Sequence, residues 1–342
     1  MSGDGDNETT TSNYYTYDYD DEICNKTDVI RFGAIVTPVF FSVVIVLSLL
    51  GNALVLVILV KYENLKSLTN TFLLNLAVSD LIFTSGLPFW ASFHVYGWTF
   101  GDAVCKGVNF VFHTGFYSSI IFLTSMTIHR YMAVVHPMSV VISRRSCPCI
   151  VTSVIIWVVS FAAATPVLIF STVKMNPNEP NVNYCGIADL NWQLWSTYQK
   201  NGFFIFAFVI MIFCYVQILM RLLRPTSHTK RRTVRLILSI VVVYFLGWAP
   251  YNVSIFLNSL MAWNVSPFNE CHISITIDYI FYVCRLVAFS HCCLNPVFYV
   301  FVGIKFRNHL KVLLRMFCKS SADPQNRHSL LIYSNGEEFS MY

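Results

Sequence analysis

The chain has 342 residues, of which 55% are hydrophobic and only 12% are charged. A soluble globular domain carries about 25% charged residues, so this composition excludes an ordinary soluble enzyme, and it equally excludes a disordered or fibrous chain. An integral membrane protein is the class that remains. The charge is uneven: residues 1–30 hold eight acids and one base, while the rest of the chain holds 22 bases and 10 acids.

The N-terminal segment, 1–31, is acidic and rich in tyrosine. Its densest part contains Tyr14, Tyr15, Tyr17, Asp18, Tyr19, Asp20, Asp21 and Glu22. One interpretation is a solvated tail without fixed structure. The other is a binding tail for a basic protein ligand, because clustered negative charge speeds and orients the encounter. Tyrosines beside acids are also candidates for sulfation, and which of them matter stays open.

Seven apolar stretches follow, each long enough for a helix that crosses a bilayer and satisfies its own backbone hydrogen bonds. They are 32–60, 68–93, 104–134, 147–173, 198–220, 236–263 and 273–303. The sequence therefore predicts an all-α fold, an integral-membrane bundle of seven transmembrane helices that occupies residues 32–304.

The lysines and arginines predict the orientation of this bundle. With the N-terminus outside, the inner loops and tail hold 17 of them and the outer side holds five, Lys26 and Lys200 included. Positive charge gathers on the cytoplasmic side of membrane proteins, so we expect an extracellular N-terminus and a cytoplasmic C-terminus. The glycosylation motifs at Asn7, Asn25 and Asn264 all fall on the outer side and agree.

Residues 305–318 follow the last span and alternate apolar and basic positions with helical spacing. This pattern predicts a short amphipathic eighth helix that lies on the lipid of the inner leaflet. Cys318, at its end, is a candidate for palmitoylation. The remaining residues, 319–342, are polar and are expected to form a flexible cytoplasmic tail.

Each predicted span contains a marker, and together the markers resemble those of the rhodopsin-type G-protein-coupled receptors. They are Gly51-Asn52, Leu76-Ala77-Val78-Ser79-Asp80, Arg130-Tyr131, Trp157, Tyr215, Trp248-Ala249-Pro250 and Asn295-Pro296-Val297-Phe298-Tyr299. One marker alone is weak evidence, whereas seven in order make a specific signal. The resemblance covers nearly the whole chain.

Within that family the chain is most similar to the chemokine receptors. The stretches that carry this likeness are Leu87-Pro88-Phe89-Trp90, Trp248-Ala249-Pro250-Tyr251-Asn252 and Ala288-Phe289-Ser290-His291-Cys292-Cys293-Leu294-Asn295-Pro296. The XC (lymphotactin) type of chemokine receptor is the nearest in kind. It shares His before the third-span Arg, no proline in mid-span five, and Arg in span seven, here His129, Ala207 and Arg285.

Four cysteines face the oxidising outer side: Cys24, Cys105, Cys185 and Cys271. An even number outside suggests two disulfides, and the residues alone allow three pairings. The resemblance implies Cys105–Cys185 and Cys24–Cys271. Metal binding is the rival interpretation, but the sequence has no Cys-x-x-Cys pair or ligating histidine cluster.

The resemblance also implies three groups of functional side chains. The ligand cavity would be lined by Trp90, Phe112, His113, Phe116, Tyr117, Tyr251 and Arg285. The activation switch would involve His129, Arg130, Tyr131, Tyr215, Trp248, Pro250, Asn295, Pro296 and Tyr299. Because 16% of the chain is aromatic, core packing is the competing interpretation for any one ring. Trp248 is the best single candidate, since the Pro250 kink beside it lets span six swing.

Asp80 is a lone carboxylate in mid-span, a costly position that usually serves a function. The resemblance implies an allosteric sodium site there, completed by Asn52, Ser119, His291 and Asn295. The alternative is a protonated Asp80 that only hydrogen-bonds its neighbours. No other cofactor, and no other metal ion, is expected.

Two positions depart from the usual family pattern. Relatives usually carry Asp before the third-span Arg, where this chain has His129. Some relatives carry an acid low in span six, where this chain has Lys230. Both ionic restraints on Arg130 would then be missing, which predicts either altered coupling or a tolerated change. Arg285 stands where most chemokine receptors have Glu. It would contact an acceptor group of the ligand, or would be a structural Arg held by Asp278 seven residues earlier.

The resulting hypothesis is a plasma-membrane chemokine receptor, of the XC type, that signals through an inhibitory-class G protein to direct cell migration. Arrestin is a further partner that the family implies. A scavenger that binds chemokine without signalling is one alternative. A transporter or channel is a remote one, because no internal repeat is present. An enzyme is not expected, and the basic loops lack any nucleic-acid-binding motif.

Overall fold

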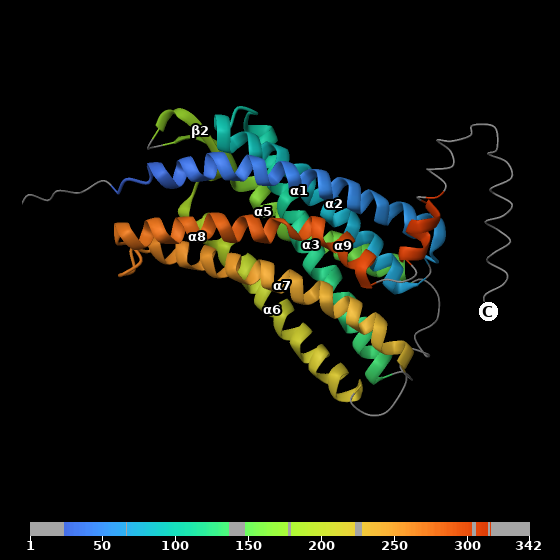
Figure 1. Cartoon of the computed structure of the whole chain (residues 1–342). Helices are drawn as coiled ribbons and strands as arrows, with labels where there is room; N and C mark the ends of the chain where they lie inside the picture. The colour runs from blue at the N-terminus through green and yellow to red at the C-terminus, as the bar shows by residue number, and fades with distance from the viewer. Residues whose placement is uncertain are drawn as a thin grey trace, which may run out of the picture.

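The computed structural model describes residues 24–65, 67–136, 148–176, 179–222, 228–302, 306–313 and 315 (Figure 1). Its helices are α1 (Thr27–Tyr62), α2 (Leu68–Tyr96), α3 (Asp102–Val135), α5 (Pro148–Phe170), α6 (Leu190–Leu222), α7 (His228–Ala262), α8 (Cys271–Phe289) and α9 (His291–Val302). Among the described residues, seven helices are long and apolar enough to cross a membrane, with α8 and the start of α9 forming the seventh. The predicted seven-helix bundle is confirmed.

Several helices extend beyond the predicted apolar stretches. The helix predicted from Tyr198 starts at Leu190, and α1 starts at Thr27 rather than at residue 32. Hydropathy marks only the part of a helix that lies in lipid, whereas backbone hydrogen bonding continues into the polar loops. The difference matters at α6, because Lys200 lies ten residues inside that helix rather than at its outer end.

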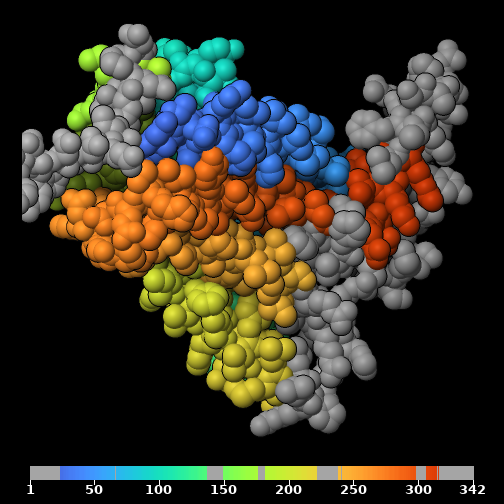
Figure 2. Space-filling model, turned by 60° about the vertical axis from the view of Figure 1, so that its left-hand side comes forward, coloured from blue at the N-terminus to red at the C-terminus, as the bar shows by residue number. Residues whose placement is uncertain are grey.

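The surface of the bundle is apolar where a soluble protein would be polar. Along α1, the buried residues include Phe41, Val44 and Ser48, which repeat with helical spacing. The opposite face exposes Val39 at 66% and Leu50 at 68%. An exposed apolar surface of this extent suits contact with lipid. In Figure 2, α8 lies between α1 and α7, and these three helices present part of that outer face.

Helix α3 runs through the centre of the bundle. Tyr117, Phe122, Leu123 and Met126 are fully buried along it. Gly115 allows a close approach of two helix backbones, since a Cβ added there would lie 2.8 Å from Cβ and 3.0 Å from Cα of Phe83 on α2. A small residue at such a crossing lets two backbones pack directly, as in other membrane bundles.

The proline of the last span leaves one carbonyl inside α9 without its helical donor. Pro296 has no N–H, so the carbonyl of Cys292 lacks its helical donor. Asn52 Nδ2 of α1 donates to that carbonyl at 2.7 Å, and Ser48 Oγ donates to it at 3.3 Å. A Cβ on Gly51 would lie 2.9 Å from the Pro296 ring. The markers of the first and last spans therefore form one contact between them.

A β-hairpin, not anticipated in the helical prediction, follows the fourth span. Strand β1 (Ser171–Asn176) pairs antiparallel with β2 (Glu179–Ile187), and Val173 lies opposite Cys185. The predicted fourth stretch, 147–173, thus ends as a helix at Phe170. The Cys105–Cys185 disulfide ties β2 to the first turn of α3, which places the hairpin at the outer end of the bundle.

The helix predicted over 305–318 is described in part, since residues 306–313 are helical. Leu313 is 6% exposed, whereas Arg307 and Lys311 are exposed. Apolar and basic residues thus lie on different sides of this segment, as an amphipathic helix requires. Cys318 and residues 319–342 lie outside the described residues.

Candidate functional site

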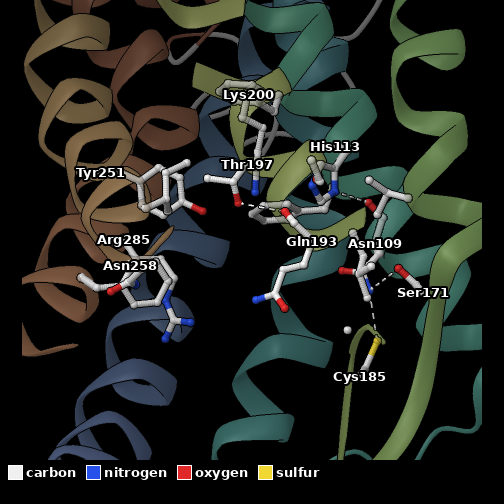
Figure 3. Close-up of a pocket in the computed structure, with 18 of the residues that line it drawn as sticks. Asn109, His113, Ser171, Cys185, Gln193, Thr197, Lys200, Tyr251, Asn258 and Arg285 are labelled. Atoms are coloured by element: carbon white, nitrogen blue, oxygen red, sulfur yellow. Dashed lines mark hydrogen bonds between the residues drawn. The ribbon is translucent and has the colours of Figure 1, made fainter. Parts of the chain in front are cut away.

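A cavity of about 480 Å³ lies at the outer end of the bundle, with walls from α3, α6, α7 and α8 and a cover from β2. Figure 3 shows part of its lining. Seven of the residues singled out from the sequence line it: Trp90, Phe112, His113, Phe116, Trp248, Tyr251 and Arg285. Tyr184, Cys185, Gly186 and Ile187 of β2 also contribute. A cavity of this size and apolar character fits a ligand segment of a few residues.

Tyr117 does not belong to this lining, so its assignment to the cavity was wrong. The side chain is fully buried, and its ring lies 5.2 Å from the ring of Phe116 and 4.8 Å from that of Phe203 on α6. On a helix, adjacent residues point about 100° apart. When Phe116 faces the cavity, Tyr117 must therefore turn into the contact between α3 and α6.

Trp248 connects the cavity with the middle of the bundle. It lines the cavity, is 1% exposed and has its ring 4.7 Å from that of Phe116 and 5.1 Å from that of His291. His291 in turn faces Asp80, with 3.8 Å between Nε2 and Oδ1. A ligand that displaced Trp248 would therefore change the contact of Trp248 with His291, the side chain that faces Asp80.

Asp80 is fully buried, and Asn295 Nδ2 donates to its Oδ2 at 2.7 Å. His291 Nδ1 lies 2.8 Å from the carbonyl of Ala288, so in the neutral ring Nδ1 carries the proton and Nε2 offers a lone pair. Two electron-rich atoms, Nε2 of His291 and Oδ1 of Asp80, then face each other. Asn52 Oδ1 and Ser119 Oγ are also buried without a hydrogen-bond partner.

Arg285 has a partner that the sequence did not indicate. Its Nη2 lies 2.7 Å from Nε2 of His94 on α2, and its guanidinium lies 4.8 Å from the ring centre of Tyr282. Asp278, considered as its structural partner, is instead 2.7 Å from Nζ of Lys26. Arg285 and His94 lie 191 positions apart in the sequence, so neither spacing nor periodicity could connect them.

Lys200 is a cavity residue that the sequence analysis placed among the outer charges. Gln193, Thr197 and Lys200 lie on one side of α6 with spacing of three and four, and all line the cavity. Asn258 of α7 does so as well. In the sequence, an isolated lysine at the edge of an apolar stretch was the one indication of a role for Lys200. Only the earlier start of α6 shows which way that lysine faces.

Both disulfides have the pairing that the resemblance implied. Cys24 bonds to Cys271, which joins the segment before α1 to the first residue of α8. Cys105 bonds to Cys185. The amide of Asn109 donates to Sγ of Cys185 at 3.1 Å and to Ser171 at 3.2 Å. The cover of the cavity is thus fixed to α3 at several points.

At the inner end, Arg130 is held by a neutral partner. Its Nη2 donates to Oγ1 of Thr69 on α2 at 2.8 Å, and none of the ion pairs found among the described residues involves Arg130. His129 Nδ1 is buried without a partner. Tyr131 bonds His136 at 3.1 Å, and Tyr215 is 7% exposed on α6. Arg130 is thus held by the hydroxyl of Thr69 instead of by an acid at the preceding position.

Other predicted positions are divided between exposed and undescribed parts of the chain. Asn25 and Asn264 are exposed, as glycan acceptors must be. The acidic tail, Asn7, Cys318 and the side chains of Lys230 and Tyr299 lie outside the described residues. These stay predictions.

Comparison with known proteins identifies the family. The profile of the 7 transmembrane receptor (rhodopsin family) matches residues 51–299. The chain belongs to the rhodopsin family of seven-transmembrane receptors. It is therefore a multi-pass plasma-membrane receptor and not an enzyme, and the transporter or channel alternative falls away.

The similar proteins are chemokine receptors. Chemokine XC receptor 1 of Homo sapiens is 44% identical over 318 residues, which cover 93% of this chain and 92% of that protein. Chemokine XC receptor 1 of Mus musculus is 46% identical over 304 residues, covering 87% and 89%. C-C chemokine receptor type 1 of Homo sapiens is 37% identical over 312 residues, covering 89% and 87%. The resemblance to chemokine receptors of the XC type is confirmed.

Proposed function

We propose that this receptor binds a chemokine of the XC type at the cell surface and signals through an inhibitory-class G protein to direct cell migration. The observation that carries the proposal is the identity of 44–46% to two XC receptors over most of the chain, against 37% to a C-C receptor over a similar length. Arg285 in the cavity supports the XC type.

The geometry suggests how the ligand acts. The acidic tail attracts a basic chemokine, and the Cys24–Cys271 disulfide holds the base of that tail beside the start of α8. The N-terminal segment of the chemokine enters the cavity and displaces Trp248. Helix α7 then swings about Pro250, and Arg130 leaves Thr69 to contact the G protein. Ligand binding shifts the population between two states, and arrestin binds the same active state.

The test of this function uses cells that express the receptor and a panel of labelled chemokines. XC-type chemokines should bind, lower cyclic AMP and evoke calcium flux, and pertussis toxin should abolish both responses. Binding and internalisation without either response would replace the proposal with the scavenger alternative. Preferential binding of a C-C chemokine would contradict the ligand assignment.

We also propose that sodium occupies the site between Asp80 and His291. The facing lone pairs of Asp80 Oδ1 and His291 Nε2, 3.8 Å apart, are acceptors that a small hard cation would satisfy. Ser119 Oγ and Asn52 Oδ1 supply further buried oxygens. The ion would stabilise the inactive arrangement, because it binds His291, whose ring contacts that of Trp248 in that state.

Removing the carboxylate should remove the sodium effect. Replacing sodium chloride by choline chloride is expected to raise agonist affinity of the wild type by about three- to tenfold, and Asp80→Asn should show no such difference. Competition binding in the two salts measures this. An equal salt effect in Asp80→Asn and wild type would show that sodium acts elsewhere.

The Arg130–Thr69 contact predicts opposite effects of two substitutions on ligand-independent signalling. His129→Asp adds a carboxylate beside Arg130 and should lower basal signalling by about threefold or more, whereas Thr69→Val removes the acceptor and should raise it by a similar factor. Basal G-protein activation at matched surface expression measures both. Unchanged or raised signalling in His129→Asp would contradict the restraint argument.

A further inference from the structure

Among the described residues, the lining of the cavity includes a lysine and an arginine but no acidic side chain. Lys200 of α6 and Arg285 of α8 line it, and none of its lining residues in the described chain is Asp or Glu. In Figure 3, Lys200 extends from the top of the view and Arg285 lies at its left, so the two side chains come from different walls. Like charges in a partly desolvated, aromatic-walled space are costly unless an anion compensates them.

Arg285 is already positioned by a neutral acceptor. His94 Nδ1 lies 2.6 Å from the carbonyl of Trp90, so in the neutral ring Nδ1 carries the proton and Nε2 accepts from Arg285 Nη2 at 2.7 Å. The ring of Tyr282 lies against the guanidinium. Arg285 Nε is buried without a partner. These contacts fix the direction of the guanidinium and leave its charge uncompensated.

The acid nearest to Arg285 along its helix is engaged elsewhere. Asp278 pairs with Lys26 at 2.7 Å, and the same Nζ donates to Ser274 at 2.6 Å. No ion pair found among the described residues involves Lys200 or Arg285. Among the described residues, no carboxylate balances these two charges, so the cavity suits an anionic group of a ligand.

We propose that the cavity is a subsite for a carboxylate carried by the first residues of the protein ligand, which binds between Lys200 and Arg285, with His94 as the positioning residue for Arg285. This proposal rests on the proposed chemokine-receptor function. A guanidinium binds a carboxylate in bidentate geometry, and an ammonium adds a second donor. A free amino terminus would instead be repelled by both groups, so the subsite selects an acidic segment.

The test pairs ligand and receptor variants. The ligands are an XC-type chemokine and forms of it in which one Asp or Glu before its first cysteine is replaced by the corresponding amide. The signalling potency of each ligand is measured on the wild-type receptor, on Arg285→Gln and on Lys200→Gln. One amide should reduce signalling potency on the wild type by at least about tenfold and much less on the two variants, because the shared contact is already lost. Lys106→Gln is the matched control, since Lys106 pairs with Asp102 outside the cavity.

The positioning role of His94 has its own readout. His94→Gln keeps an acceptor for Arg285 and should keep the preference for the carboxylate form, whereas His94→Leu should lose that preference at equal surface expression. A loss of the preference in both variants, or in neither, would contradict the positioning role. Potency that is independent of every ligand carboxylate, or additive losses in Arg285→Gln, would overturn the subsite.

A second probe separates this inference from the proposed function. The purified receptor in lipid nanodiscs is titrated with phenylacetate or with phenethylamine, which have similar size and opposite charge. Phenylacetate should raise the Tm by about 2 °C or more, and the rise should vanish when Lys200 and Arg285 are both replaced by Gln. A rise with phenethylamine instead would overturn the subsite. If no chemokine binds the wild type, the proposed function fails and this experiment alone decides the inference.

Discussion

Breaking the Cys24–Cys271 disulfide is expected to lower chemokine affinity by about ten- to a hundredfold. The disulfide ties the end of the acidic tail to the first residue of α8, across 247 positions of sequence. It therefore raises the effective concentration of tail-bound ligand at the cavity, and a longer tether lowers that concentration. Saturation binding of labelled chemokine at matched surface expression measures the loss.

Cys24→Ser, Cys271→Ser and the double variant should lose the same affinity, because all three remove one bond. Lys26→Met is the companion variant. It breaks the contact with Asp278 and Ser274 that also holds this segment against α8, and its loss should add to that of the disulfide. Additive losses of the two cysteine variants would show that they act separately.

Replacing Gly115 by alanine is expected to destabilise the receptor by up to about 3 kcal/mol, and valine there should abolish surface expression. The added Cβ would lie 2.8 Å from Cβ and 3.0 Å from backbone atoms of Phe83, so α2 and α3 must move apart. Thermal unfolding of the purified receptor and cell-surface staining measure the two effects.

Gly107 provides the control for Gly115 on the same helix. A Cβ at Gly107 meets nothing within 4 Å, and alanine has a better helix propensity than glycine by about 1 kcal/mol. Gly107→Ala should therefore leave the Tm unchanged or raise it. A similar fall of the Tm in both variants would show that helix crossing distance does not limit stability at Gly115.

Much of the candidate site could be predicted, because each sequence marker lies within one helix and can be recognised without knowing how the helices pack. Trp90, Phe112, His113, Phe116 and Tyr251 line the cavity as the family pattern implied, and both predicted disulfides are present. Tyr117 was misplaced because the pattern gives a position along α3 but does not give the direction of each side chain.

The sequence by itself determined the class, the seven membrane-spanning helices and their orientation, since hydropathy and charge act locally along the chain. Only the tertiary structure decided the partners. Arg285 meets His94 rather than Asp278, Arg130 meets Thr69, and Lys200 faces the cavity. Each of these depends on how one helix is rotated and packed against another. Composition and periodicity show which residues are apolar, whereas close packing between distant segments selects which polar groups meet.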